Sequence, residues 1–201
     1  IYAPESREDH QAIYDAMTAE AEASPPGANG VIFLPHLAGD RAPIWDPHAR
    51  GVFYGLSLGA QRGDLIRAIM EGVAYAMRHL IELIESCSGV RVRRVITVGG
   101  AARNRLWRQI KADVWGVDLA ASPVADASAL GAALTAGVGV GIYSSYQDAV
   151  QRAVPQAGEL TTPNPATRPA YDHTYRIYRQ LYPALRDTMR FAAESQIGGA
   201  P

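Results

Sequence analysis

The 201-residue sequence has a single cysteine, Cys87, so no disulfide bond can form within the chain. Cys87 lies in an apolar helical pattern, and we expect its thiol to be packed against neighbouring side chains. The five histidines are scattered without the spacing of metal ligands, which argues against a transition-metal site. The sequence also has neither a P-loop nor the Gly-x-Ser-x-Gly turn of serine hydrolases, so it indicates neither of these site types.

An excess of charge of one sign is also missing. Lysine and arginine together number 19 and aspartate and glutamate 20, so no basic field would attract nucleic acid or an anionic membrane. No stretch approaches the roughly 20 apolar residues of a membrane span, and residues 1–10 lack a signal-peptide core. With the lone cysteine, these features predict a cytoplasmic protein. The chain does not begin with Met, which suggests a piece of a longer protein.

The residues that are present indicate a folded domain of alternating strands and helices. Hydrophobic residues make up 48% of the chain and charged residues 19%, which is typical of globular proteins. Alternating strands and helices predict an α/β domain with partly parallel strand pairing. Apolar periodicity predicts helices over 6–23, 64–88, 103–115, 127–140 and 171–185, and apolar or β-branched runs predict strands over 31–34, 51–56, 95–98 and 117–121.

Three further local features can be read from the sequence. Asp64 is expected to cap the helix that follows it. The segment 159–169 contains three prolines and is expected to be a loop. The tail 196–201 is expected to be loose.

The most informative short segment is a glycine turn between a strand and a helix. Gly99, Gly100 and Ala101 leave the strand ending at residue 98, and backbone N–H groups at such a helix start can bind phosphate. A plain tight turn is the alternative. Asn104 could bind the edge of a purine or a ribose hydroxyl, or it could cap the helix. We expect Gln109 and Asp113, one helical turn apart, to have structural roles.

Four motifs then occur in a fixed order. Residues 33–43 read FLPHLAGDRAP and are followed by WDPHARG at 45–51 and by Gly55-Leu56. RAIMEGV stands at 67–73, GGAARNRLWRQIKAD at 99–113, and SALGAA at 128–133. In this order the motifs resemble those of the FGGY family of carbohydrate kinases, and the likeness to xylulokinases is strongest. Asp40 departs from the pattern, because the family usually has Glu there.

The resemblance implies the actin-like ATPase (ribonuclease H-like) fold, in which two α/β domains close on ATP. Residues 1–201 would form a single partial domain belonging to the C-terminal, nucleotide-binding half, with the N-terminal sugar-binding domain absent. Its core would span about 30–155, with a C-terminal helical extension over about 168–195. By the same resemblance, Gly99 and Gly100 would face the phosphates of ATP, Asn104 would face its adenosine, and Ala101 would also belong to the nucleotide-binding residues.

The family transfers the γ-phosphoryl group of ATP to a sugar hydroxyl with Mg²⁺ and an Asp general base. That Asp and the sugar pocket precede this segment in the family. The resemblance therefore implies no catalytic residue and no metal ligand in this chain, which alone is expected to be inactive. Asp40, Asp46 and Glu71 are expected to be structural.

The partners implied are ATP and a small sugar. D-xylulose, phosphorylated to D-xylulose 5-phosphate, is the first choice of substrate. Another pentulose, a tetritol or autoinducer-2 remains an alternative. A noncatalytic nucleotide-binding or assembly module is the alternative from another class, and a homodimer is left open.

Overall fold

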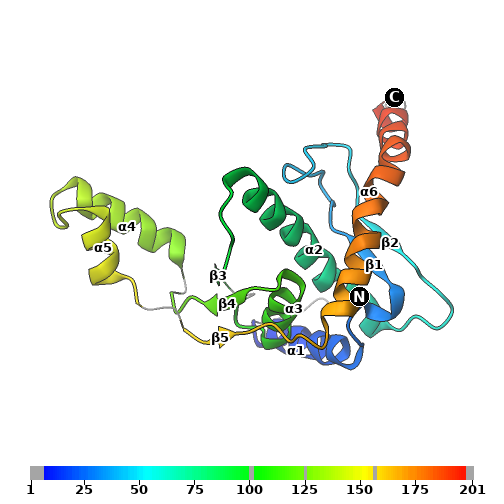
Figure 1. The fold of residues 1–201 in the computed structure, drawn as a ribbon, viewed down its shortest axis with the longest axis horizontal. Coiled ribbons are helices and arrows are strands. Elements are labelled where there is room, and N and C mark those ends of the chain that lie inside the picture. The colour runs from blue at the N-terminus through cyan, green and yellow to red at the C-terminus, as the bar shows by residue number, and fades with distance from the viewer. Residues whose placement is uncertain (1–6, 100–101, 125, 156–157, 198–201) are drawn as a thin grey trace.

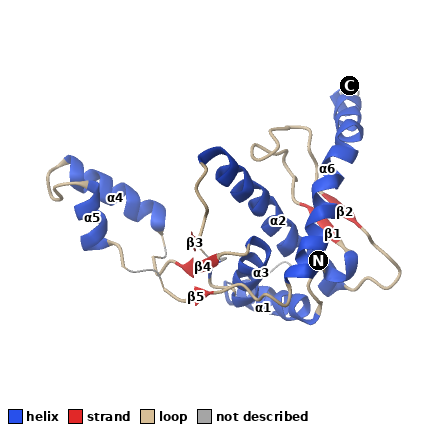
Figure 2. Cartoon of the chain, in the orientation of Figure 1, coloured by secondary structure: helices blue, strands red, loops and turns tan. Residues whose placement is uncertain are grey.

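A computed structural model describes residues 7–99, 102–124, 126–155 and 158–197 of the chain (Figures 1 and 2). Helices form most of the ordered structure, and the strands are short. In chain order the elements are α1 (Arg7–Ala23), η1 (Ala28–Gly30), β1 (Ile32–Leu34), β2 (Val52–Tyr54), α2 (Arg62–Ser88), β3 (Arg94–Thr97), α3 (Arg105–Trp115), β4 (Asp118–Ala121), α4 (Ala127–Gly139), α5 (Tyr146–Ala153), β5 (Leu160–Thr161) and α6 (Arg168–Ile197).

The strands form two small sheets. β1 and β2 pair as an antiparallel hairpin, and the second sheet has the order β3-β4-β5. β3 and β4 are parallel, so the expectation of partly parallel pairing is confirmed. The prediction that 159–169 is only a loop is wrong, because Leu160 and Thr161 pair antiparallel with Ala120 and Leu119 of β4. This pairing depends on a strand about forty residues earlier and left no local signal in the sequence.

The helices predicted from periodicity are all present. The changes at their ends are small except in α6, which continues beyond residue 185 to Ile197 and so includes residues 196 and 197 of the tail that was expected to be loose. Asp64 contributes to the start of α2, but not as its N-cap residue. Gln61 is the N-cap, and the Asp64 carboxylate accepts hydrogen bonds from the Gln61 N–H at 2.9 Å and the Ser24 hydroxyl at 2.6 Å. The side chain of Asn29 donates a third, at 2.9 Å. Asp64 therefore joins the beginning of α2 to the two segments that precede it. Helix α5 had not been predicted.

The buried face of α2 is not its most apolar one. Ile69, Met77 and Ile84, which mark the helix in the sequence, are 39%, 40% and 49% exposed. Cys87, further along α2, is exposed as well, so the expectation of a packed thiol is wrong. The sequence pattern identified the helix correctly, but the neighbouring elements decided which side is buried.

Gly72 lies on the buried side of α2, where the helix crosses β1. A Cβ at this position would lie 2.2 Å from the carbonyl oxygen of Phe33, so only glycine allows the approach. Helix α2 thereby packs directly on the strand. The phenyl rings of Phe33 and Phe53 contact each other across the hairpin, with centroids 4.6 Å apart.

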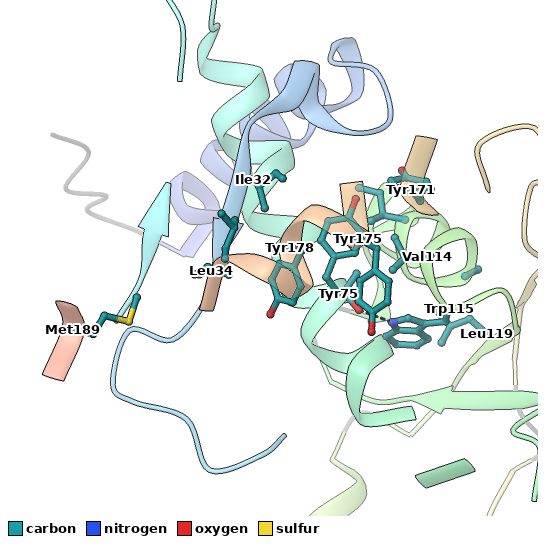
Figure 3. Close-up of a cluster of buried hydrophobic side chains, with 14 residues drawn as sticks. Ile32, Leu34, Tyr75, Val114, Trp115, Leu119, Tyr171, Tyr175, Tyr178 and Met189 are labelled. Atoms are coloured by element: carbon teal, nitrogen blue, oxygen red, sulfur yellow. Dashed lines mark hydrogen bonds between the residues drawn. The ribbon is translucent and has the colours of Figure 1, made fainter. Parts of the chain in front are cut away.

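The main hydrophobic core lies where α2, α3, β1, β4 and α6 meet (Figure 3). Tyr75 of α2 packs against Tyr175 and Tyr178 of α6, with ring centroids 5.8 and 5.4 Å away. The indole N–H of Trp115 at the end of α3 donates to the carbonyl oxygen of Ala74 at 2.9 Å. Helix α6 is thus an integral wall of the core, and it holds α2 and α3 together.

A buried ion pair connects α2 to α6 and to the end of α1. The Arg67 guanidinium donates to Glu71 at 2.7 Å, to the carbonyl oxygen of Ser24 at 2.8 Å and to the hydroxyl of Tyr171 at 2.7 Å. Glu71 also accepts from the N–H of Gly27 at 3.0 Å. Burial raises the pKa of Glu71, and the positive charge of Arg67 opposes that rise. Arg67 and Glu71 therefore hold α2, α6 and the end of α1 in one arrangement.

Helices α4 and α5 project from the rest of the molecule and pack on each other (Figure 1). The small side chains of α4 would allow close packing against a neighbouring element. Among its residues only Gly137 is buried, so most of this apolar helix faces outward. Within the described ranges, no helix is long and apolar enough to cross a lipid bilayer.

We predict that Glu71→Gln will lower the free energy of unfolding by about 3 kcal/mol, because it leaves the buried guanidinium of Arg67 without its counter-charge. Urea denaturation followed by circular dichroism measures this change. The exposed Glu22→Gln on α1 is the matched control and should change stability little. Equal stability of the Glu71 and Glu22 variants would show that the buried pair does not organise the fold.

Asp64 should make stability depend on acid pH. Hydrogen bonds from Ser24, Gln61 and Asn29 hold the pKa of its carboxyl below the usual value. The unfolded chain therefore takes up the proton first, and the contribution present above about pH 4 is lost as pH falls through the folded pKa. We expect Asp64→Asn to flatten the decline of the urea midpoint between about pH 5 and pH 2. The exposed Asp187→Asn should keep the wild-type slope, and an unaltered slope in Asp64→Asn would contradict the prediction.

Candidate nucleotide site

The glycine turn lies at the carboxyl end of β3, where the chain passes into α3. Gly99 has a φ of 85°, in the left-handed region that favours glycine. A Cβ added to it would meet no atom within 4 Å among the described residues, so this side of the turn is open. The N–H of Ala102 closes the turn on the carbonyl oxygen of Gly99 at 3.1 Å. Gly100 and Ala101, also predicted to bind the nucleotide, lie outside the described residues.

Asn104 is the N-cap of α3. Its side-chain oxygen accepts from the N–H of Trp107 at 2.9 Å, which satisfies one of the free donors at the helix start. Its side-chain amide donates to the hydroxyl of Thr18 on α1 at 2.8 Å. The helix-capping alternative is therefore present in the structure, and Asn104 remains half-buried at the edge of the turn.

Arg108 binds the backbone at the end of the glycine turn, a role that the sequence analysis did not predict. Its guanidinium donates to the carbonyl oxygen of Ala102 at 2.9 Å and to the carboxylate of Glu159 at 2.5 Å. The side chain is buried, and its Nε has no partner among the described residues. Arg108 is close to the glycine turn in the sequence. Glu159 is 51 residues further along the chain and reaches Arg108 only because the chain folds back at β5.

Gln109 and Asp113 have the structural role that was expected. The Asp113 carboxylate is buried and accepts from the side chain of Gln109 at 2.6 Å, the N–H of Asn164 at 2.7 Å and the hydroxyl of Thr167 at 3.0 Å. These bonds attach the segment before α6 to α3. The end of α3 away from the glycine turn is therefore bound to the segment that follows β5.

The electrostatic character of the turn suits an anion. The N-terminus of α3 points its unpaired N–H groups and the positive end of its dipole toward the turn. Exposed Arg103 and Arg105 stand on either side of Asn104 and add positive charge. Among the described residues no group of three His, Cys, Asp or Glu side chains could hold a metal ion. The residues at the turn therefore fit phosphate better than a protein-bound metal.

The acidic residues of the first motif are used elsewhere in the fold. One Asp40 oxygen accepts from the N–H of Ala42 at 2.9 Å, and the other lies 3.1 Å from His36. Asp46 accepts from the hydroxyl of Tyr182 at 2.6 Å, which attaches the loop between β1 and β2 to α6. Glu71 is buried in the ion pair described above. These contacts agree with structural roles for all three.

Comparison with known proteins decides the family. The model of the C-terminal domain of the FGGY family of carbohydrate kinases matches residues 3–140, more than half of the chain. The chain belongs to the FGGY family of carbohydrate kinases. The glycine turn and Asn104 lie within the matched region, as does the whole of α2. The fold is accordingly the α/β, actin-like ATPase fold that the motifs had implied.

Relatives with different substrates in their names are similar to this FGGY chain. A xylulose kinase of Staphylococcus epidermidis is 31% identical over 162 residues, which cover 81% of this chain and 32% of that protein. A glycerol kinase of Shewanella piezotolerans is 38% identical over 148 residues, 73% of this chain and 30% of that protein. The crystal structure of a xylulose kinase from Rhodospirillum rubrum superposes with a TM-score of 0.74 at 35% identity, covering 93% of this chain and 36% of that one. The chain thus spans about a third of the length of the curated relatives that it matches.

We predict that Asn104→Ala will lower the free energy of unfolding by about 1 kcal/mol through loss of the helix cap. Asn104→Ser should keep most of the stability, because a serine hydroxyl can accept from the N–H of Trp107. Thermal and urea denaturation of the two variants measure the difference. Equal losses in both would mean that the capping bond contributes little.

Proposed function

We propose that this chain is the nucleotide-binding part of an ATP-dependent carbohydrate kinase. The observation that carries the proposal is the open, left-handed turn at Gly99 between a parallel strand and the N-terminus of α3. Such a turn lets phosphate oxygens approach backbone N–H groups closely, and the helix dipole favours their negative charge. Gly99, Gly100 and Ala101 would contact the phosphates, and Asn104 the adenosine.

ATP would supply the γ-phosphoryl group, and Mg²⁺, when bound, would neutralise charge during the transfer. The described residues bind and orient the nucleotide: the turn contacts phosphate, Arg108 fixes the carbonyl of Ala102, and Arg103 and Arg105 add positive potential. The side chains discussed above include no free carboxylate beside the turn that could serve as a general base. Proton transfer from the sugar hydroxyl would then be carried out by another part of the kinase that contains this chain.

D-xylulose is the substrate that we propose first, because relatives named xylulose kinase match the chain over 81% of its length and over 93% in a solved structure. Glycerol is the second candidate, favoured by the higher identity of 38% to a glycerol kinase. A coupled assay of ADP release by the whole kinase, with D-xylulose and glycerol offered in parallel, separates the two. The product of the first reaction would be D-xylulose 5-phosphate, and faster turnover of glycerol would overturn the first choice.

We predict that Gly99→Val will weaken ATP binding at least tenfold, because a β-branched residue cannot readily keep the left-handed backbone of the turn. Isothermal titration calorimetry on the chain measures the affinity. Gly89→Val is the matched control, since Gly89 also has a positive φ of 69° and open space around it, but ends α2. Unchanged ATP affinity in a folded Gly99→Val protein would contradict the proposed site.

A further inference from the structure

We propose that Thr18 is a positioning residue that orients the side chain of Asn104 for the nucleotide. The proposal rests on the nucleotide-binding function proposed above. Thr18 lies on α1, 86 positions before Asn104, and no motif marks it in the sequence. The question is whether the oxygen or the nitrogen of the Asn104 side-chain amide is available to a ligand.

The hydrogen bonds of Thr18 determine the direction of the amide. Its hydroxyl lies 2.7 Å from the carbonyl oxygen of Tyr14, an atom that can only accept. The single hydroxyl proton is therefore used within α1, and the Thr18 oxygen can only accept from Asn104, 2.8 Å away. The nitrogen of the Asn104 amide, and not its oxygen, must face Thr18.

A second contact sets the other half of the amide in the same orientation. The N–H of Trp107 can only donate, and it lies 2.9 Å from the side-chain oxygen of Asn104. Two independent partners thus fix the amide, one from α1 and one from α3. One of its two N–H groups is taken by Thr18, and the other is left for a ligand. Asn104 would accordingly present a donor to an acceptor atom of the nucleotide, because its oxygen already serves the helix.

The position of α1 does not depend on Thr18. Arg67 binds the carbonyl oxygens at the end of α1, and Arg62 of α2 forms an ion pair with Glu20. Removal of the Thr18 hydroxyl should therefore leave the helix in place and leave the Asn104 amide held only by the N–H of Trp107. This separates an effect on binding from an effect on folding.

The test compares Thr18→Val, which cannot accept a hydrogen bond, with Thr18→Ser, which can. Calorimetric titration of the chain with ATP should give an affinity about fivefold weaker for Thr18→Val, the equivalent of one neutral hydrogen bond, and a near wild-type affinity for Thr18→Ser. The matched control is Thr135→Val on α4, because Thr135 makes the same bond to a carbonyl four residues earlier but lies outside this contact. Equal ATP affinity in Thr18→Val and wild type would overturn the proposal.

A double-mutant cycle distinguishes this failure from failure of the proposed function. If Thr18 acts through Asn104, Thr18→Val should have no further effect on ATP affinity in an Asn104→Ala background. Additive losses would overturn the positioning role. If neither Asn104→Ala nor Gly99→Val changes the ATP affinity, the nucleotide site itself is wrong. If those two weaken binding and Thr18→Val does not, only the role of Thr18 is wrong.

Nuclear magnetic resonance of the unmodified chain gives a readout that does not require a variant to fold. The two side-chain amide protons of Asn104 should exchange with water at different rates, because one is bound to Thr18 and the other is free. Addition of ATP should slow the exchange of the free proton. Equal exchange of both protons without ATP, or no response to ATP at saturation, would overturn the proposal.

Discussion

The guanidinium of Arg67 and the carboxylate of Glu71 are removed from water, 5% and 1% exposed, and the arrangement of the helices follows from how these charges are satisfied. An isolated buried charge is costly, so each group must find partners where it lies. Arg67 finds them in Glu71, in the carbonyl oxygens at the end of α1 and in Tyr171 of α6. Because these partners come from three helices, satisfying the pair couples the positions of those helices.

Through α1, the same constraint extends to the glycine turn. Helix α1 is held at its end by Arg67, and its middle presents Thr18 to Asn104 at the start of α3. From the other side, Arg108 and Asp113 attach α3 to the β5 segment. Hydrogen bonds therefore hold α3 on two sides, whereas the space around Gly99 is open. A rigid frame around an open turn is the arrangement that prearranged phosphate binding requires.

Many polar residues of the family motifs serve the fold rather than a ligand. Asp46 attaches a loop to α6, Glu71 accepts hydrogen bonds from Arg67 and from the N–H of Gly27, and Asp113 orders the approach to α6. Their carboxylates are buried and accept several hydrogen bonds each, which is how such groups are tolerated in an interior. Other motif residues are exposed, among them Leu37 and Trp45 in the loop between β1 and β2 and Gly99 at the turn. A motif residue can therefore serve either the fold or a ligand, and only the surroundings of its side chain show which of the two roles it has.

The amino-acid sequence alone determined the main helices, the partly parallel strand pairing, the glycine turn and the family, because apolar periodicity, glycine at a strand end and ordered motifs are local signals. It also left the capping role of Asn104 as an open alternative that the structure realises. Only the tertiary structure decided which face of α2 is buried, that Leu160 and Thr161 form a strand, and that Cys87 is exposed. It alone brought Thr18 to Asn104 and Glu159 to Arg108. Each of these outcomes depends on residues that are far apart in the sequence and meet only in the folded chain. A local sequence pattern carries no information about such contacts.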